Sequence, residues 1–371
     1  MNRARRRRGA ALAAVAGALV AVACGAGHPA PPSPKPSPPV RAFAATSGSW
    51  LGLAYNSSGG VGTAERFALE GIAYDRSGPL EVKAGLTPAT SPELARGLRL
   101  SLRAGMIPDI EVDPGEGPTG CTGDPNASTL CLPVDAGGIR AYVDGFVATA
   151  GAIRQAYPGV RIVFEPMNEP WDWGSPPGLQ SGRASAREYA AVLVPLLTAA
   201  RTAGIPLADI YVPGAASMQD GSQWISDLYA AAPCLAPGSG TCGPIDGWNL
   251  HPYGLPGQTT EGIGSVPGQR ALMRSGADNI IISEMGFCAD DIAGGADCDE
   301  NRSDITGTAA QTARWLSQTL TAALDMRRAG WLKGLLVWDR SGGGWAMEAE
   351  DGRLTPQGRV LVRFARSVGG G

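Results

Sequence analysis

Short apolar segments alternate with longer amphipathic ones from about residue 50 to the end of the chain. The short segments are rich in β-branched and aromatic residues, as buried strands are, and the longer ones are typical of helices. Strands and helices in alternation predict an α/β fold, a closed (β/α)8 TIM barrel in a single domain. The alternative is a doubly wound open sheet, but no G-x-G-x-x-G sequence follows the first predicted strand. The eight predicted strands are Leu51–Tyr55, Gly71–Asp75, Ile107–Val112, Arg161–Phe164, Asp209–Val212, Asp246–Leu250, Asn279–Ser283 and Gly334–Trp338.

Five of the amphipathic segments predict helices whose ends carry the usual signals. Ser91 stands before Pro92, which suits an N-cap followed by proline at the first helical position. Gly105, Gly204 and Gly330 follow three of these segments, where a glycine readily ends a helix. The five predicted helices are Pro92–Ala104, Ala136–Ala156, Ala184–Ala203, Thr308–Arg328 and Pro356–Ser367.

The first 23 residues predict a signal peptide. Five arginines and no acidic residue precede a run of small and apolar residues that is too short for a comfortable membrane span. Ala21-Val22-Ala23 is a cleavage pattern, and Cys24 follows it at once. The site resembles a bacterial lipobox, in which the cysteine is lipidated and becomes the first mature residue, although Ala21 replaces the usual larger aliphatic residue. Ordinary secretion with an unmodified Cys24 is the alternative.

The chain divides by composition into three parts: the signal peptide 1–23, a proline-rich linker 24–45, and the barrel domain 46–371. Proline-rich segments are extended, semi-rigid tethers that cannot bury a core. Beyond residue 23 the chain carries 26 Lys and Arg against 34 Asp and Glu. This acidic balance argues against nucleic acid as a partner, and it leaves a lipid at Cys24 as the expected route to a membrane.

Seven cysteines are present, and six of them form three closely spaced couples. Six cysteines allow 15 pairings, but the spacing favours the three local disulfides Cys121–Cys131, Cys234–Cys242 and Cys288–Cys298. Each couple follows a predicted strand, so we expect all three disulfides to brace loops on the active-site face. Zinc is the rival interpretation, but the chain has no C-x-x-C sequence and one histidine after His28, so no metal is expected.

Polar and aromatic residues come directly after most of the predicted strands. In a barrel of this kind, side chains at the carboxyl ends of the strands meet at one face, where active sites are built. Carboxylates, an arginine and an indole face would together suit a sugar site. Each residue also has an alternative interpretation without a role in the site. Arg76 could form a surface ion pair, Asp113 could be part of a turn, and Trp338 could belong to the core. In chain order these residues are Asn56, Arg76, Asp113, Asn168, Glu169, His251, Tyr253, Glu284, Trp338 and Asp339.

Two glutamates in their local sequences resemble those of a known group of enzymes. Asn168-Glu169-Pro170 after the fourth strand, and Glu284 in Ile281-Ile282-Ser283-Glu284-Met285-Gly286 after the seventh, resemble clan A glycoside hydrolases in the style of families 5 and 39. The segment ending in Arg76, the His251-Pro252-Tyr253 sequence, Trp338 and the loop 352–358 resemble the same families in order. The chain differs at Glu111-Val112-Asp113-Pro114, where many family 5 enzymes have a histidine.

The resemblance implies an exported retaining glycoside hydrolase that acts on a poly- or oligosaccharide. Glu284 would be the nucleophile and Glu169 the acid/base, while Glu165 is interpreted as a strand-end residue. No cofactor and a monomer are expected. Transglycosylation on the same residues, or a non-catalytic surface carbohydrate-binding lipoprotein, are the alternatives. The further expected roles are Asn168 on the sugar 2-hydroxyl, Arg76 and Tyr253 as orienting residues, His251 as a hydrogen-bonding support, Asp113 in the site, and Trp338, Trp171 and Trp173 as aromatic surfaces.

Overall fold

The computed structural model describes residues 49–54, 67–114, 132–133, 135–172, 185–214, 221–238, 242–292, 298, 305–338, 343–349 and 351–368. The described residues all lie in one compact unit, Val40–Gly371. Residues 1–39 lie outside the described residues, as do the expected signal peptide and linker. The same holds for Cys24, Asn56, the Cys121–Cys131 couple, Trp173 and Asp339.

Eight parallel strands form the ring of the barrel, and they correspond one to one with the eight predicted strands. Parallel pairing runs β1–β2–β4–β5 on one side and β6–β7–β8–β11–β1 on the other. A single bridge between Phe164 and Ile210 joins the two halves at β5 and β6. The (β/α)8 prediction is confirmed, and the open-sheet alternative is wrong. The strands are β1 Leu51–Ala54, β2 Tyr74–Arg76, β4 Ile107–Asp113, β5 Val163–Pro166, β6 Tyr211–Pro213, β7 Gly247–Leu250, β8 Ile280–Ile282 and β11 Leu332–Trp338.

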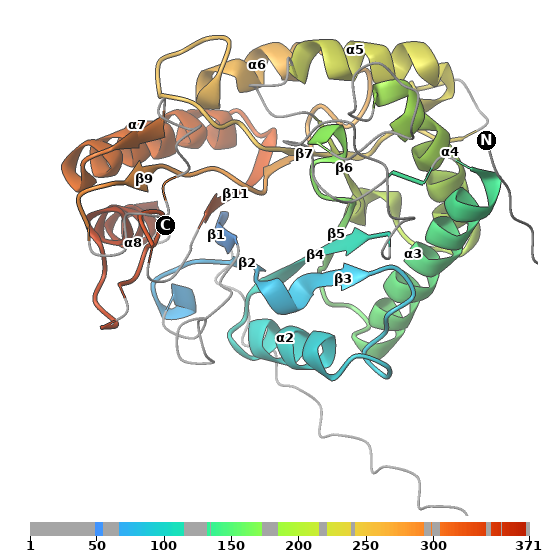
Figure 1. The fold of residues 1–371 in the computed structure, drawn as a ribbon, viewed down its shortest axis with the longest axis horizontal. Helices are drawn as coiled ribbons and strands as arrows, with labels where there is room; N and C mark the ends of the chain where they lie inside the picture. Colours follow the sequence, from blue (N-terminus) through green and yellow to red (C-terminus); the bar gives the residue numbers. More distant parts are fainter. Residues whose placement is uncertain are drawn as a thin grey trace, which may run out of the picture. The chain divides into compact units, whose positions relative to one another are not determined.

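Helices follow most of the barrel strands and lie around the sheet (Figure 1). The five predicted helices are confirmed within one or two residues at their ends, and two more, α5 and α6, are present. Ser91 Oγ accepts a hydrogen bond from Leu94 N at 3.2 Å, and Gly105 has φ of 74°, as their sequence signals predict. Among the helices that the structure describes, none is long and apolar enough to cross a membrane. The helices are α2 Pro92–Arg103, α3 Ala136–Ala156, α4 Ala186–Thr202, α5 Gly221–Ala231, α6 Gly262–Leu272, α7 Ala309–Arg328 and α8 Pro356–Val368.

Short strands and 3-10 turns lie in the connections between the barrel strands and helices. β3 (Glu81–Lys83) pairs with the last three residues of β4, and β9 (Cys288–Ala289) pairs with β10 (Thr306–Gly307). Single 3-10 turns cover Gly78–Leu80, Pro170–Asp172, Leu207–Asp209 and Pro233–Leu235. Since β3 and β9 follow the carboxyl ends of β2 and β8, both add to the face where the candidate site lies.

The two faces of each barrel strand meet different surroundings. In β4, Ile110 and Val112 belong to the large apolar core between strands and helices. Side chains alternate along a strand, so Asp109 and Glu111 point into the barrel instead. A second apolar cluster that includes Tyr74, Tyr211, Val163, Ile281 and Leu336 is separate from that core, as an interior layer of a barrel would be. Polar residues therefore lie between this interior layer and the carboxyl-terminal face.

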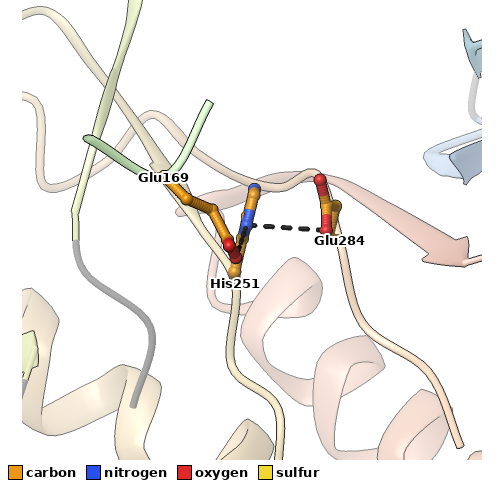
Figure 2. A group of neighbouring side chains, drawn as sticks. All are labelled: Glu169, His251 and Glu284. Carbon is orange, nitrogen blue, oxygen red and sulfur yellow. Dashed lines mark hydrogen bonds and ion pairs between the residues drawn. The ribbon is translucent and has the colours of Figure 1, made fainter. Parts of the chain in front are cut away.

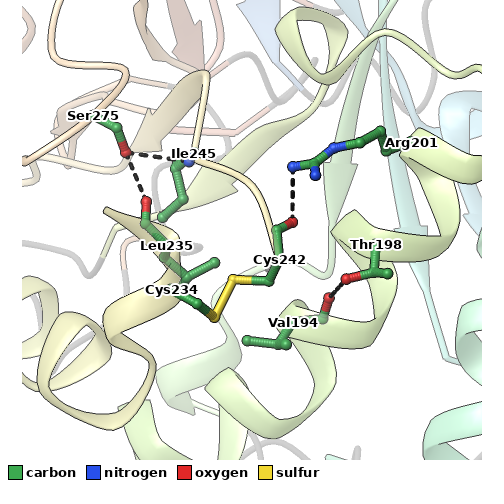
Figure 3. The surroundings of a disulfide bond; sticks show 8 residues. All are labelled: Val194, Thr198, Arg201, Cys234, Leu235, Cys242, Ile245 and Ser275. Atoms are coloured by element: carbon green, nitrogen blue, oxygen red, sulfur yellow. Dashed lines mark hydrogen bonds between the residues drawn. A yellow bond between two sulfur atoms is a disulfide. The ribbon is translucent and has the colours of Figure 1, made fainter. Parts of the chain in front are cut away.

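The Cys234–Cys242 disulfide is confirmed, but its expected position is wrong (Figure 3). Helix α5 intervenes between β6 and Cys234, so the bridge lies in the connection leading into β7. Arg201, in the last turn of α4, donates to the Cys242 carbonyl at 3.0 Å. The ends of helices that lead into strands lie at the amino-terminal face of such a barrel. This disulfide therefore braces the face opposite the candidate site.

The Cys288–Cys298 disulfide is also confirmed. It begins in β9, directly after the Glu284 segment, on the side of the barrel that carries the candidate site. Ala289 N donates to the Gly344 carbonyl at 2.8 Å, which ties this loop to the segment after β11.

Candidate active site

The end of β5 holds Glu169 on a constrained backbone. Met167 and Glu169 have φ of 73° and 42°, values that residues with a side chain seldom adopt. Such conformations cost on the order of 1–3 kcal/mol each and persist only where the surroundings enforce them. Here Met167 N donates to the Val112 carbonyl at 3.1 Å, and Asn168 N donates to Asp113 Oδ1 at 3.1 Å. The neighbouring strand β4 thus sets the direction in which Glu169 leaves the barrel.

Glu284 follows β8 and is 2 % exposed. Its Oε1 accepts a hydrogen bond from Arg76 Nη1, and its Oε2 accepts one from Tyr253 OH at 2.9 Å. Hydrogen bonds to both oxygens favour the ionised form of a carboxylate and fix its plane. Arg76 in β2 and Tyr253 after β7 therefore both contact the Glu284 carboxyl group and fix its orientation.

Arg76 lies at the end of β2 and its side chain is fully buried. Its Nη2 donates to Glu111 Oε2 at 2.6 Å and to Asn168 Oδ1 at 3.1 Å. The same nitrogen lies 3.2 Å from Glu165 Oε2, whose side chain is also fully buried. The surface ion pair considered for Arg76 is thus wrong, because one buried guanidinium joins three carboxylates and an amide.

His251 connects Glu169 to the barrel interior. Its Nε2 lies 2.9 Å from Ser283 Oγ, and that hydroxyl donates to Asn249 Oδ1. The Ser283 oxygen is then free to accept from Nε2–H, so Nδ1 faces Glu169 Oε1 at 2.8 Å. That contact needs a proton, carried either by Glu169 or by the imidazole.

The surroundings of His251 favour its holding that proton. Burial lowers the pKa of His251, but Glu284 and the hydrogen bond to Glu169 outweigh this, so the net pKa is raised. Trp171 packs edge-on against the imidazole, with ring centroids 5.9 Å apart. The ring is therefore held in place while it shares a proton with Glu169.

The two glutamates lie close together across the site (Figure 2). One oxygen of Glu169, one of Glu284 and a ring nitrogen of His251 all lie within 4.8 Å of one another. Carboxyl groups about 5–5.5 Å apart suit a covalent glycosyl intermediate, whereas inverting enzymes hold theirs about 6.5–9.5 Å apart to admit a water. The observed separation matches the shorter arrangement.

Three ligand-type side chains so close together are also a geometry that could hold a metal ion. Both oxygens of Glu284 already accept hydrogen bonds, one of them from the Arg76 cation. A guanidinium bonded to a carboxylate opposes a second cation at the same carboxylate. This donor set therefore fits a hydrogen-bonded proton-transfer site better than a metal centre.

The aromatic residues divide into buried supports and residues at the edge of the site. Trp171 is 4 % exposed and packs against Trp224, which disfavours the sugar-platform role considered for it. Trp338 is partly buried and packs edge-on against Trp345, with ring centroids 6.5 Å apart. Trp345 also packs edge-on against Tyr253 at 6.3 Å. The role of Trp338 as an aromatic surface stays a prediction.

Several members of this network were not predicted from the sequence. Glu165 is the next-to-last residue of β5, which agrees with its interpretation as a strand-end residue, but its contact with Arg76 was not predicted. Asp109 and Glu111 precede the predicted Asp113 at every second position of β4, and this period of two is the signal that could have placed them on the inner face. Ser283, Asn249 and Trp345 carry no comparable local signal, because their role depends on contacts with distant segments.

Burial raises the pKa of many of the carboxyls around Arg76. It raises the pKa of Glu81 to about 8, with a further contribution from Glu111. It raises the pKa of Asp109 to about 7, although Arg76 lowers it. Asp113 has a raised pKa because of burial and its neighbour Glu111. A single guanidinium thus cannot keep all these groups ionised.

Comparison with known proteins supports the architecture. No protein-family model and no curated protein sequence matches the chain. Solved structures do match: a family 5, subfamily 18 glycoside hydrolase from Bifidobacterium longum subsp. infantis aligns with a TM-score of 0.55 at 16 % identity, over 86 % of this chain and 79 % of the other. The chain has the barrel fold of glycoside hydrolase family 5.

Other matching structures have varied substrates. An exo-β-1,4-mannosidase from Opitutaceae bacterium strain TAV5 aligns with a TM-score of 0.55 at 16 % identity, over 86 % of this chain and 61 % of the other. A family 5 xyloglucanase from Paenibacillus pabuli aligns with a TM-score of 0.51 at 13 % identity, over 88 % of this chain and 99 % of the other. At these identities the likeness concerns the fold.

Proposed function

We propose that this protein is a retaining glycoside hydrolase. The observation that carries the proposal is the pairing of Glu284, held by Arg76 and Tyr253, with Glu169, held by His251, within 4.8 Å. One carboxylate is fixed as an anion and the other shares a proton with an imidazole. Those are the two states that double displacement requires of its nucleophile and its acid.

The first half-reaction breaks the glycosidic bond. Glu284 attacks the anomeric carbon and forms an ester, while a proton held between Glu169 and His251 passes through Glu169 to the departing oxygen. Arg76 and Tyr253 keep the attacking carboxylate in one plane, so that it is already oriented when the substrate binds. The partner of Arg76, Asn168, is positioned to bond the sugar 2-hydroxyl.

The second half-reaction releases the sugar. Glu169, now ionised, takes a proton from an incoming water, and the water oxygen displaces Glu284 from the anomeric carbon with net retention. With the proton gone, the Nδ1 lone pair of His251 and the Glu169 carboxylate face each other 2.8 Å apart, which raises the affinity of Glu169 for the proton of the incoming water. A sugar hydroxyl in place of water would give transglycosylation by the same residues.

The substrate we propose is a β-linked oligo- or polysaccharide. Two matching subfamily 18 structures contain Manβ1-4GlcNAc, and other matches include a mannosidase, β-1,4-galactanases, a xyloglucanase and a cellulase. We also propose export of the protein, with residues 1–23 as the signal peptide, residues 24–45 as the linker and a lipid at Cys24. Two intramolecular disulfides support an oxidising compartment.

The test is a pair of isosteric variants on a panel of aryl β-glycosides. Glu169→Gln and Glu284→Gln should each lose at least about 100-fold in kcat/KM, because each removes a proton-transfer or nucleophilic group. Azide added to Glu284→Ala should restore turnover and give the inverted glycosyl azide. Asp144→Asn, the same chemical change on an exposed residue of α3, is the control.

Two results would count against the proposal. Activity of Glu284→Gln near that of the wild type would remove the nucleophile assignment. A wild-type protein that binds glycans but turns over none of the panel would instead favour a carbohydrate-binding barrel.

A further inference from the structure

Two carboxyls lie buried beneath Arg76 with no role in the reaction described above. Asp109 in β4 and Glu165 in β5 are both 0 % exposed. Within the described residues, none of their four carboxyl oxygens accepts a hydrogen bond from a donor group. Arg76 Nη2 lies 3.2 Å from Glu165 Oε2, but the same nitrogen already serves Glu111 and Asn168. A buried carboxylate without donors is costly, so the two groups need another source of stabilisation.

The charged groups around Asp109 and Glu165 indicate how the two buried carboxyls are stabilised. Arg76 already pairs with Glu284 and Glu111, so it cannot neutralise Asp109 and Glu165 as well. The Asp109 and Glu165 carboxyls lie within hydrogen-bonding contact of each other. Two carboxyls in contact avoid mutual repulsion by sharing one proton, with one group donating to the other. The groups that face the pair are Tyr74 and Arg76 from β2, Glu111 from β4, Tyr189 from α4, Tyr211 from β6, His251 after β7 and Glu284 after β8.

We propose that Asp109 and Glu165 share a proton and act as a positioning pair that holds the Arg76 guanidinium toward Glu284. The proposal rests on the proposed function, since it assigns the pair a part in presenting the nucleophile. A pair holding its proton carries a single negative charge and competes only weakly for Arg76. A pair that has lost it carries a second negative charge directly beneath Nη2, and it draws the guanidinium away from Glu284 and Asn168.

The protonation behaviour of the pair agrees with this geometry. Burial raises the pKa of Asp109 to about 7, against the lowering effect of Arg76. Burial also raises the pKa of Glu165, and the charge on Asp109 raises it further. The shared proton is therefore held in acidic solution and is lost as the pH rises through neutrality and beyond. Loss of this proton should therefore lower the reactivity of the nucleophile Glu284 in alkaline solution.

The experiment must separate this decline from the titration of Glu169. A 2,4-dinitrophenolate leaves without protonation, so its 2-deoxy-2-fluoro-β-glycosides label the nucleophile without help from a general acid. We would measure the inactivation rate from about pH 5 to pH 9 with the 2,4-dinitrophenyl 2-fluoro-β-mannoside, -glucoside and -galactoside. Glu169→Gln provides the background in which the acid/base cannot titrate.

The test variant is Asp109→Asn, whose amide keeps the shape and a donor but cannot ionise. We expect the ratio of inactivation rates near pH 8.5 and pH 6 to rise at least tenfold over that of the parent protein. Asp144→Asn should leave the ratio unchanged. A ratio for Asp109→Asn within twofold of the parent would overturn the proposal. Should Asp109→Asn fail to fold, Glu165→Gln is measured in its place, with the same expectation.

A second measurement needs no substrate and stands if the proposed function fails. The midpoint of urea unfolding should fall as pH rises from about 5 to 8, because the folded pair binds a proton that the unfolded chain has released. Asp109→Asn should flatten this slope, and Asp144→Asn should not. A flattened slope without any change in inactivation would show a shared proton that does not position Arg76, and it would overturn the inference. An unchanged slope would show that no proton is shared.

Discussion

Replacing Arg76 with methionine should destabilise the protein in a manner that depends on pH. Methionine keeps much of the length and apolar surface of the side chain and removes the charge. Arg76 contacts Glu111, Glu165 and Glu284, each with a side chain 3 % exposed or less. Removing one partner from a buried ion pair costs about 3–5 kcal/mol, because the other partner is left uncompensated. We expect a loss of that size near pH 7.

The pH dependence follows from where protons bind. Arg76 lowers the pKa of Glu165 and of Asp109. Without it their folded-state pKa values rise, so the folded variant takes up protons that the unfolded chain, with carboxyl pKa values near 4, has released. Stability then falls as pH rises above about 4, by about 1.4 kcal/mol per pH unit for each extra proton bound. One extra proton makes the loss near pH 7 about 3 kcal/mol larger than the loss near pH 5.

The assay is urea unfolding of the wild type and Arg76→Met near pH 5 and pH 7, followed by circular dichroism. Arg353→Met serves as the matched control, because its side chain is 87 % exposed and its ion pair with Asp351 is long, at 3.6 Å. That variant should stay within about 0.5 kcal/mol of the wild type. A loss below about 1 kcal/mol for Arg76→Met, or an equal loss at both pH values, would refute the reasoning.

Three further predictions concern the loops, the anchor and metal ions. Gly344→Ala should lower kcat about tenfold, because its Cβ would lie 2.6 Å from a backbone oxygen and from a disulfide sulfur and would displace Trp345. Gly151→Ala is the control, since its Cβ would meet nothing within 4 Å and kcat should not change. Equal kcat in both variants would contradict this prediction. If Cys24 is lipidated, palmitate label and membrane attachment should vanish in Cys24→Ser; wild type found unlabelled in the medium would exclude the anchor. EDTA should change neither the turnover nor the melting temperature, and a lowered value of either would point to a bound cation.

The local sequence determined the elements and the positions of the two glutamates. Apolar segments of β-branched residues define the eight strands, and Ser91 and Gly105 define the ends of α2, because these signals act over a few neighbouring residues. Since parallel strands present their carboxyl ends at one face, residues after β5 and β8 had to converge. Glu169 and Glu284 could thus be placed at one site before any contact was known.

Only the tertiary structure decided which buried polar residues meet. Asp109, Glu111 and Glu165 belong to strands buried on both faces. The period of two in β4 indicates that Asp109 and Glu111 share a face, but it does not reveal which residues of other strands they meet there. Their proximity to Arg76 comes from the register of β4 between β2 and β5. The Cys234–Cys242 bridge lies at the opposite face because α5 intervenes, and Trp345 reaches Tyr253 across 92 positions of sequence. Such contacts depend on how distant segments pack, which short-range patterns of residues do not encode.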